Sequence, residues 1–392
     1  MKNRLRLNTI LTGLFVVLVL ASSRSISRAQ TCFPLTTTSW VGTPTGNGEF
    51  FDPANWSAAC RPNGQTNAFV NNGAGISAFD TSVSSIAHLR ILVVGENQGD
   101  SGSVKVDQSA FINFRIDEEC REGEAAPTPS PYLGGDTYIG RAGKGTLVIG
   151  NGNLLMSGSA FVAAIANPNG SRASSSVTVL GSGTIWRFFG PCVGHQLCIG
   201  CDRLPEGGTT DSGGTGSVTV NDPGRIEIYN DDPASPGLKV GISGTLAGNG
   251  IVKLATQLSA CSDCQTAKVL GTFAPNGQLK IQGNLDLSSS SASAVVHVQP
   301  QGADSINVMQ TTGFGHVKLG GRLTVVITGN FSQGQTFNLL HADGGRLNNS
   351  TFAFTSIIDT GTGCYTPTIV VVDNSNGSSD VNLQLQPRDR CD

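Results

Sequence analysis

A short strand motif recurs along this chain of 392 residues and constrains its fold more than any other feature. An apolar pair and a glycine lead, through a glycine-rich turn, into a strand in which apolar and polar residues alternate. The motif occupies residues 92–106, 138–149 and 197–220, begins again at 238–241, and a strand of the same kind covers 177–179. The central apolar residues are Val104, Leu147, Val177 and Val218, at steps of 43, 30 and 41 residues. Each unit has one apolar face that it cannot bury alone, so stacked copies must cover one another.

These repeats predict an all-β chain that folds as a right-handed parallel β-solenoid (β-helix) with terminal caps. Glycine between the strands supplies the positive φ that the turns need. We expect an N-terminal cap over residues 30–75, solenoid repeats over 76–270, and the last rungs with a C-terminal β cap over 271–392, because unpaired strands at a solenoid end promote aggregation. The uneven steps imply protruding loops, notably at 118–136 and 201–215. A set of β-sandwiches is the competing interpretation.

The composition agrees with a turn-rich β protein and excludes two other classes. The chain is 38% hydrophobic and only 14% charged, with 51 glycines. Wholesale disorder needs low hydrophobicity with high net charge, and collagen needs glycine at every third position, which this sequence lacks. The composition by itself indicates no reaction.

Three segments carry a family resemblance. They are the opening segment from Trp40 through Asn55-Trp56-Ser57 to Pro62, the Tyr-Ile-Gly pattern at 138–149, and the closing segment from Val317 through 334–340 to Phe352. In this order they resemble bacterial autotransporter passengers and PEP-CTERM-associated repeat proteins, over most of residues 39–385. The resemblance implies a secreted or surface-displayed β-helix with structural, adhesive or matrix roles and no family-wide catalytic residues. The chain departs from those families because it has no translocator barrel and no Pro-Glu-Pro sorting signal, which leaves its export and anchoring routes open.

The first 29 residues have the features of a secretory signal peptide. Three basic residues precede an apolar run over 10–21, and small residues suit cleavage after Ala29, with Ser23 as a competing site. The run is too short to cross a bilayer, which takes about 20 residues. Cleavage removes five basic residues and leaves 20 basic against 28 acidic ones, a formal net charge of −8. We therefore expect a secreted, extracellular or cell-surface protein with no transmembrane segment in the mature chain and no nucleic-acid partner.

Ten cysteines in an exported chain predict structural disulfides. The cysteines are Cys32, Cys60, Cys120, Cys192, Cys198, Cys201, Cys261, Cys264, Cys364 and Cys391. We expect Cys32 to pair with Cys60 and Cys364 with Cys391, although one sequence does not fix the connectivity. The two Cys-x-x-Cys motifs at 198–201 and 261–264 leave a tetrathiolate zinc site or a redox-active pair as alternatives.

Several motifs resemble catalytic or binding loops without completing them. Ser101 and Ser212 each follow an aspartate and precede a glycine, as in the nucleophile loop of trypsin-like serine proteases, but only His88 precedes Ser101. That chemistry needs a histidine and an aspartate upstream in a different arrangement. The Gly-Lys pair at 143–144 and the glycine run at 213–216 fail the spacing of a phosphate loop and of a calcium-binding repeat. We interpret all of these as turns between repeat strands.

Acidic and aromatic side chains supply the remaining candidates. Carboxylates gather at Asp117, Glu118, Glu119, Glu122 and Glu124, and again at Asp231 and Asp232. Glycoside hydrolysis would need two such groups about 5 to 9.5 Å apart, and a solvated acidic loop is the simpler interpretation. The histidines, His88, His195, His297, His316 and His341, lack metal-binding spacing. The candidate ligand contacts are Trp186, Phe188 and Phe189, which could stack on a sugar or contact a protein, with core packing at a rung end as the alternative.

From the repeats and the signal peptide we expect a non-enzymatic protein with a structural or adhesive role in the bacterial cell envelope or extracellular matrix. The candidate partners are cell-surface glycans and other envelope or matrix proteins. We expect no cofactor, no catalytic residue and no metal ligand. The alternatives are a polysaccharide-active β-helix enzyme and a carbohydrate-binding protein without turnover.

Overall fold

The computed structural model describes residues 32, 36–42, 48–50, 52–77, 87–106, 113–116, 135–150, 152–165, 174–189, 195–202, 209–233, 235–256, 261, 263–311, 313–332, 334–361 and 363–388. The predicted signal peptide at 1–29 lies outside these residues. So do positions 118–134 of the first predicted loop and 203–208 of the second.

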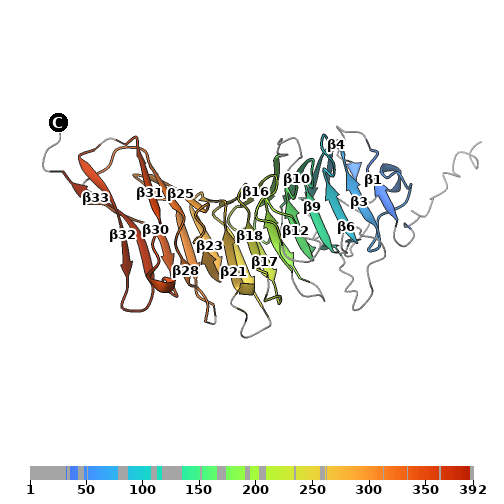
Figure 1. Ribbon diagram of the computed structural model, residues 1–392. Helices are drawn as coiled ribbons and strands as arrows, with labels where there is room; N and C mark the ends of the chain where they lie inside the picture. The colour runs from blue at the N-terminus through green and yellow to red at the C-terminus, as the bar shows by residue number, and fades with distance from the viewer. Residues whose placement is uncertain are drawn as a thin grey trace, which may run out of the picture. The chain divides into compact units, whose positions relative to one another are not determined.

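Three β-sheets make up the described part of the chain, and successive strands enter them in turn. Between β3 and β25 each circuit places one strand in sheet 1, one in sheet 2 and one in sheet 3, and each strand pairs in parallel with the equivalent strand of the next circuit. Figure 1 shows the resulting series of neighbouring strands, from β1 in blue to β33 in red. This arrangement is a parallel β-solenoid, as the repeats predicted, and it excludes a set of sandwiches.

The strands of each sheet follow one another along the stack. Sheet 1 contains β1 (Thr37–Ser39), β3 (Asn67–Val70), β6 (Ile91–Val94), β9 (Asp136–Ile139), β12 (Ser159–Val162), β15 (Leu197–Ile199), β18 (Leu238–Val240), β21 (Thr266–Val269), β24 (Asn284–Asp286) and β28 (Val317–Lys318). Sheet 2 contains β2 (Gly48–Glu49), β4 (Asn72–Ser77), β7 (Ser101–Val106), β10 (Lys144–Ile149), β13 (Ser174–Val179), β16 (Thr215–Val220), β19 (Gly244–Gly248), β22 (Thr272–Pro275), β25 (Ser293–Gln299), β29 (Arg322–Ile327) and β31 (Phe354–Asp359), with β26 (Gly302–Ala303) antiparallel to β25. Sheet 3 contains β5 (Ala87–Leu89), β8 (Asn113–Ile116), β11 (Leu154–Ser157), β14 (Ile185–Phe188), β17 (Arg225–Tyr229), β20 (Ile251–Ala255), β23 (Gln278–Gln282), β27 (Ser305–Met309), β30 (Thr336–Ala342), β33 (Ser379–Pro387) and β32 (Tyr365–Asp373). Three short 3-10 turns, η1 (Pro53–Asn55), η2 (Asp263–Gln265) and η3 (Leu347–Asn349), complete the described elements.

The core is a ladder of apolar side chains in register. Leu147 pairs with Val104 on one side and with Val177 on the other, and Val177 pairs with Val218. All four are at most 1% exposed. The ladder continues through Leu246 and Phe273, which are also buried. The four positions expected from the repeat therefore form one column, because alternate residues of every strand point into the same interior.

Glycine in the motif has two separate structural reasons. Gly95, Gly140 and Gly200, which end the apolar pairs, have φ between 68° and 73°, a conformation that other residues adopt at a cost. Gly145 and Gly216 begin the alternating strands of sheet 2 and have no such φ. A Cβ at either would lie 2.6 Å from a backbone carbonyl oxygen of a neighbouring coil. These corners therefore need glycine because two backbones approach closely.

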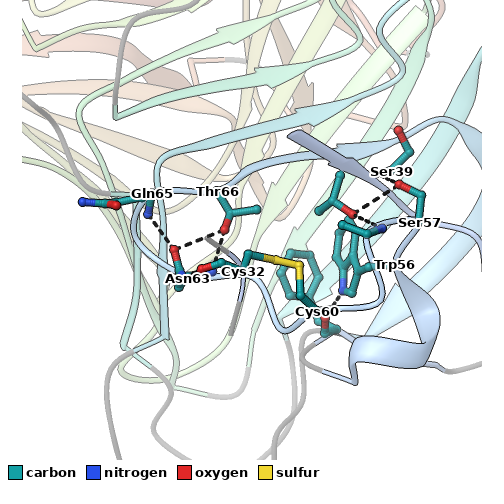
Figure 2. The surroundings of a disulfide bond; sticks show 11 residues. Cys32, Ser39, Trp56, Ser57, Cys60, Asn63, Gln65 and Thr66 are labelled. Atoms are coloured by element: carbon teal, nitrogen blue, oxygen red, sulfur yellow. Dashed lines mark hydrogen bonds between the residues drawn. A yellow bond between two sulfur atoms is a disulfide. The ribbon is translucent and has the colours of Figure 1, made fainter. Parts of the chain in front are cut away.

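A disulfide and a tryptophan pair organise the N-terminal segment, and Figure 2 shows the disulfide between Cys32 and Cys60 with Trp56 beside it. Cys32 and Cys60 are bonded, which confirms the expected pair. Trp40 and Trp56 meet edge to face with ring centroids 5.3 Å apart, and Trp56 Nε1 donates to the Phe50 carbonyl oxygen at 2.5 Å. These three aromatic side chains are at most 2% exposed, so they extend the apolar core beyond the first coils.

An antiparallel hairpin ends the described chain. β33 lies between β30 and β32 and pairs antiparallel with both. Arg346 binds Asp373, and this ion pair, together with the Ser379 hydroxyl, lowers the pKa of Asp373 to about 2. Burial and a hydrogen bond to Asp359 raise the pKa of Tyr365 to about 12. The hairpin is thus fixed by polar contacts at both of its strand ends.

The outer face of sheet 1 is also buried over its first half. Val93, Tyr138, Phe161 and Cys198 occupy one outward-facing column and are at most 1% exposed. Together with neighbours they form a second apolar cluster, separate from the interior core. In this half of sheet 1, strands such as β6 are therefore apolar on both faces, which is why their sequences do not alternate.

Candidate binding surface

The three aromatic residues proposed as ligand contacts lie on opposite faces of sheet 3. Trp186 and Phe188 point into the core and have no exposed surface. Trp186 Nε1 donates to the Ser157 hydroxyl at 3.2 Å. A side chain without exposed surface cannot stack on a ligand, so the prediction is wrong for these two residues and core packing explains them. Phe189, the next residue along, is 43% exposed and remains a candidate.

Phe189 belongs to a polar and aromatic surface on the outside of sheet 3. We define the sheet 3 patch as Phe189 together with the outward-facing side chains of four successive strands, β14, β17, β20 and β23. These side chains are Ile185, Arg187, Arg225, Glu227, Tyr229, Ile251, Lys253, Ala255, Gln278, Lys280 and Gln282. The register brings them together although they span almost a hundred residues of sequence.

Glu227 is the one acidic residue of the sheet 3 patch. It is 4% exposed and pairs in register with Arg187 and Lys253. Arg187 donates to one Glu227 carboxylate oxygen through Nε at 2.8 Å and Nη2 at 2.7 Å, and Arg225 Nη1 lies 3.5 Å from the other oxygen. A buried carboxylate needs such partners, because an unpaired one would be strongly destabilising. Glu227 thus holds two guanidinium groups against the sheet.

An aromatic corner borders these charges. The rings of Phe189 and Tyr229 meet edge to face, with centroids 5.7 Å apart. Lys253 Nζ lies 5.7 Å from the centroid of the Tyr229 ring, within range of a cation–π interaction. The corner therefore combines a partly exposed ring with an oriented cation.

The cations of the sheet 3 patch are spaced one to each coil. Arg187 is on β14, Arg225 on β17, Lys253 on β20 and Lys280 on β23. Neighbouring strands of a sheet are about 4.8 Å apart, so the four strands present a cation at each step along the stack. The patch has four cations against one carboxylate, on a chain whose net charge is negative.

The described Cys-x-x-Cys motifs form disulfides within themselves. Cys198 bonds to Cys201 and Cys261 to Cys264, so the two motifs do not assemble a tetrathiolate site. Cys364 is also disulfide-bonded. Cys120, Cys192 and Cys391 lie outside the described residues. The prediction that the cysteines form disulfides is confirmed for the pairs named here.

The two serines in protease-like motifs, Ser101 and Ser212, lie at the start of a repeat strand and in the turn before one. Ser101 is the first residue of β7. Asp211, before Ser212, accepts from Lys239 Nζ at 2.8 Å, and this hydrogen bond lowers its pKa. In the described residues, the side chains that contact these two aspartate–serine pairs are Asn97, Thr210 and Lys239, and none of them is a histidine.

Of the two acidic groups proposed, one can be located. Asp231 follows the aromatic corner and accepts from the Thr256 hydroxyl at 2.6 Å, while the backbone N–H of Asp232 donates to Asn230. The cluster of Asp117, Glu118, Glu119, Glu122 and Glu124 lies outside the described residues. Among the described residues, no three His, Cys, Asp or Glu side chains are placed to hold a metal ion.

The histidines are dispersed over the structure. His195 is buried, with Nδ1 3.1 Å from the Gly158 carbonyl oxygen. His341 bridges Asp380 at 2.7 Å and Asp343 at 3.0 Å. Burial alone would lower the pKa of His341, but the two carboxylates together raise it above its ordinary value. This cluster stabilises the junction of β30 and β33 by charge pairing.

The sheet 3 patch, as defined by its described residues, contains a single carboxyl group, Glu227. Its one carboxylate is buried and engaged by arginines, whereas glycoside hydrolysis needs two available carboxyl groups. Its other side chains, exposed or partly exposed, are cations, amides, two aromatic rings and three aliphatic groups. These groups recognise negative charge and the apolar faces of sugar rings.

Comparisons with known proteins do not assign the chain. No family model and no curated protein matches it.

Proposed function

We propose that this chain is an exported, non-enzymatic solenoid with a structural or adhesive role in the bacterial cell envelope or extracellular matrix. The observation that carries the proposal is the uninterrupted stack of three parallel sheets, whose outer face presents the sheet 3 patch. A stack of this kind displays a row of side chains at a fixed repeat, which suits binding to an extended partner.

The disulfides support an oxidising compartment. Three disulfides are described and no described cysteine is free. Disulfides persist in secreted and periplasmic proteins and are rare in the cytosol. A signal peptide over residues 1–29 is the export route that we propose. In the described part of the chain, no helix is long and apolar enough to cross a membrane.

Fractionation of the source organism tests location and role together. The mature chain should begin near Gln30 and be recovered with the outer surface, the periplasm or the extracellular matrix. Purified mature chain should also sediment with isolated cell envelopes and be released without any change in the envelope glycans. Recovery in the cytosol with residues 1–29 retained would contradict the proposal.

A turnover assay separates this proposal from an enzyme. The purified chain should release no reducing sugar and no unsaturated product from uronic-acid and neutral glycans. Reproducible release that Asp231→Ala abolishes would instead establish a polysaccharide-active enzyme.

A further inference from the structure

The sheet 3 patch has a charge that differs in sign from the rest of the mature chain. Four cations and one buried carboxylate leave it cationic, whereas the predicted mature chain carries a formal charge of −8. A surface lined by charges of one sign creates a local potential that attracts ligands of the opposite sign, so this strip favours an anionic ligand.

The spacing of the cations restricts the shape of that ligand. Arg187, Arg225, Lys253 and Lys280 lie on four consecutive strands, with the register alternating them between two adjacent columns. The step of about 4.8 Å between strands is comparable to the length of one pyranose ring in an extended polysaccharide. One cation then meets each successive sugar residue of a chain that runs along the stack.

The aromatic corner adds a contact that charge alone does not supply. Phe189 is 43% exposed and its ring is held edge to face by Tyr229. Sugar rings have apolar C–H faces that pack on aromatic rings, whereas a compact ion such as phosphate gains nothing from them.

We propose that the sheet 3 patch binds an acidic polysaccharide, with one carboxylate or sulfate for each sugar residue, laid across β14, β17, β20 and β23. Arg187 and Arg225, which are 31% and 46% exposed, bind the acidic groups from positions fixed by Glu227. Lys253 and Lys280 bind the next groups along the chain. Phe189 packs on one sugar face at the end of the row. The inference rests on the adhesive role proposed above and names its ligand class.

Affinity electrophoresis with the intact mature protein tests the assignment. Polygalacturonate and alginate in the gel should retard the protein, and dextran and amylose should not. The double variant Lys253→Glu/Lys280→Glu should weaken binding to polygalacturonate by about tenfold or more, because each cation near an anionic surface contributes roughly 1 kcal/mol. Added salt should weaken binding by the wild type.

Two further variants make the test specific. Glu227→Gln removes the carboxylate that positions Arg187 and Arg225, so it should weaken binding although it makes the patch more cationic. The double variant Lys268→Glu/Lys318→Glu makes the same charge change at two exposed residues of sheet 1 and should leave binding within about twofold of the wild type, since both residues lie outside the patch. The charge-reversal variants should melt with the wild-type protein, whereas Glu227→Gln should melt lower because it breaks a buried ion pair.

The possible outcomes separate this inference from the proposed function. Equal weakening by Lys268→Glu/Lys318→Glu would show a non-specific charge effect and overturn the assignment. Equally tight, patch-dependent binding of single-stranded DNA would make the patch a general polyanion site and also overturn it. If the double variant still sediments with cell envelopes as the wild type does, the adhesive role stands and the patch is not its cause. If neither protein sediments with envelopes, the proposed function itself fails.

Discussion

Replacing Trp186 by alanine should destabilise the protein far more than replacing Phe189. Trp186 has no exposed surface, and its ring lies 4.8 Å from that of Phe188, centroid to centroid. Removing a buried tryptophan side chain costs about 3–5 kcal/mol, because the surrounding strands cannot collapse fully into the cavity. The substitution also removes the donor to Ser157, for roughly 1 kcal/mol more. Phe189→Ala, at a position 43% exposed, should cost below about 1 kcal/mol.

Equilibrium unfolding in urea, followed by far-ultraviolet circular dichroism, measures both changes. This signal is suitable because it does not depend on the tryptophan that is removed. If Trp186→Ala does not fold, Trp186→Phe should fold with an intermediate loss of stability, since it keeps most of the ring volume. A loss for Trp186→Ala no larger than that for Phe189→Ala would refute the inward orientation of Trp186.

Three further predictions concern the cap, the corners and the hairpin. Cys32→Ala/Cys60→Ala should lower the free energy of unfolding by about 2–4 kcal/mol, and an unchanged urea midpoint would contradict a stapled N-terminal segment. Gly145→Ala should destabilise by about 1–3 kcal/mol because its Cβ meets the backbone of the neighbouring coil, while Thr146→Ala in the same strand serves as the control. The raised pKa of His341 means that its stabilising charge is fully present below about pH 6.5 and is lost as the pH rises through the folded-state pKa. The melting temperature should therefore fall over that upper pH range in the wild type and fall less in His341→Gln. The corresponding loss in free energy of unfolding should be below about 1 kcal/mol, because the His341 side chain is a third exposed. Identical pH profiles of the two proteins would exclude this contribution.

The interior column could be predicted because it depends only on local alternation. Val104, Leu147, Val177 and Val218 each sit at the centre of a strand with period two, and parallel stacking brings equal positions into register. The positions of the turn glycines could also be predicted from the sequence, although the sequence alone suggests a positive φ for all of them. At Gly145 and Gly216 the reason is instead the approach of another coil.

The sheet 3 patch could not be predicted because it depends on pairing between coils. Arg187 and Lys253 are 66 positions apart in sequence, and only the strand register places them on either side of Glu227. Alternation within β14 does separate Trp186 and Phe188 from Phe189, so this local pattern could have assigned the buried and exposed rings.

The burial of the outer face of sheet 1 and the pairing of the cysteines also could not be predicted from local sequence patterns. Strands such as Ile91–Val94 are apolar at every position, and a period-two rule cannot say that both faces are covered. The spacing of Cys198 and Cys201 fits an internal disulfide as well as half of a metal site. The fold decides between them, because each motif closes on itself within one coil.

One distance between spin labels tests the continuous stack most directly. Lys105 and Ala274 lie in the same outward column of sheet 2, five strand steps apart through Val148, Thr178, Thr219 and Ala247. The labels are attached at Lys105→Cys and Ala274→Cys; no described cysteine is free, and the unsubstituted protein taken through the same reaction is the control for label at any other position. The stack predicts one narrow distribution near about 24 Å, from five steps of roughly 4.8 Å, although 169 positions of sequence separate the two sites. A broad distribution, or one centred far beyond this distance, would contradict a single stack of coils.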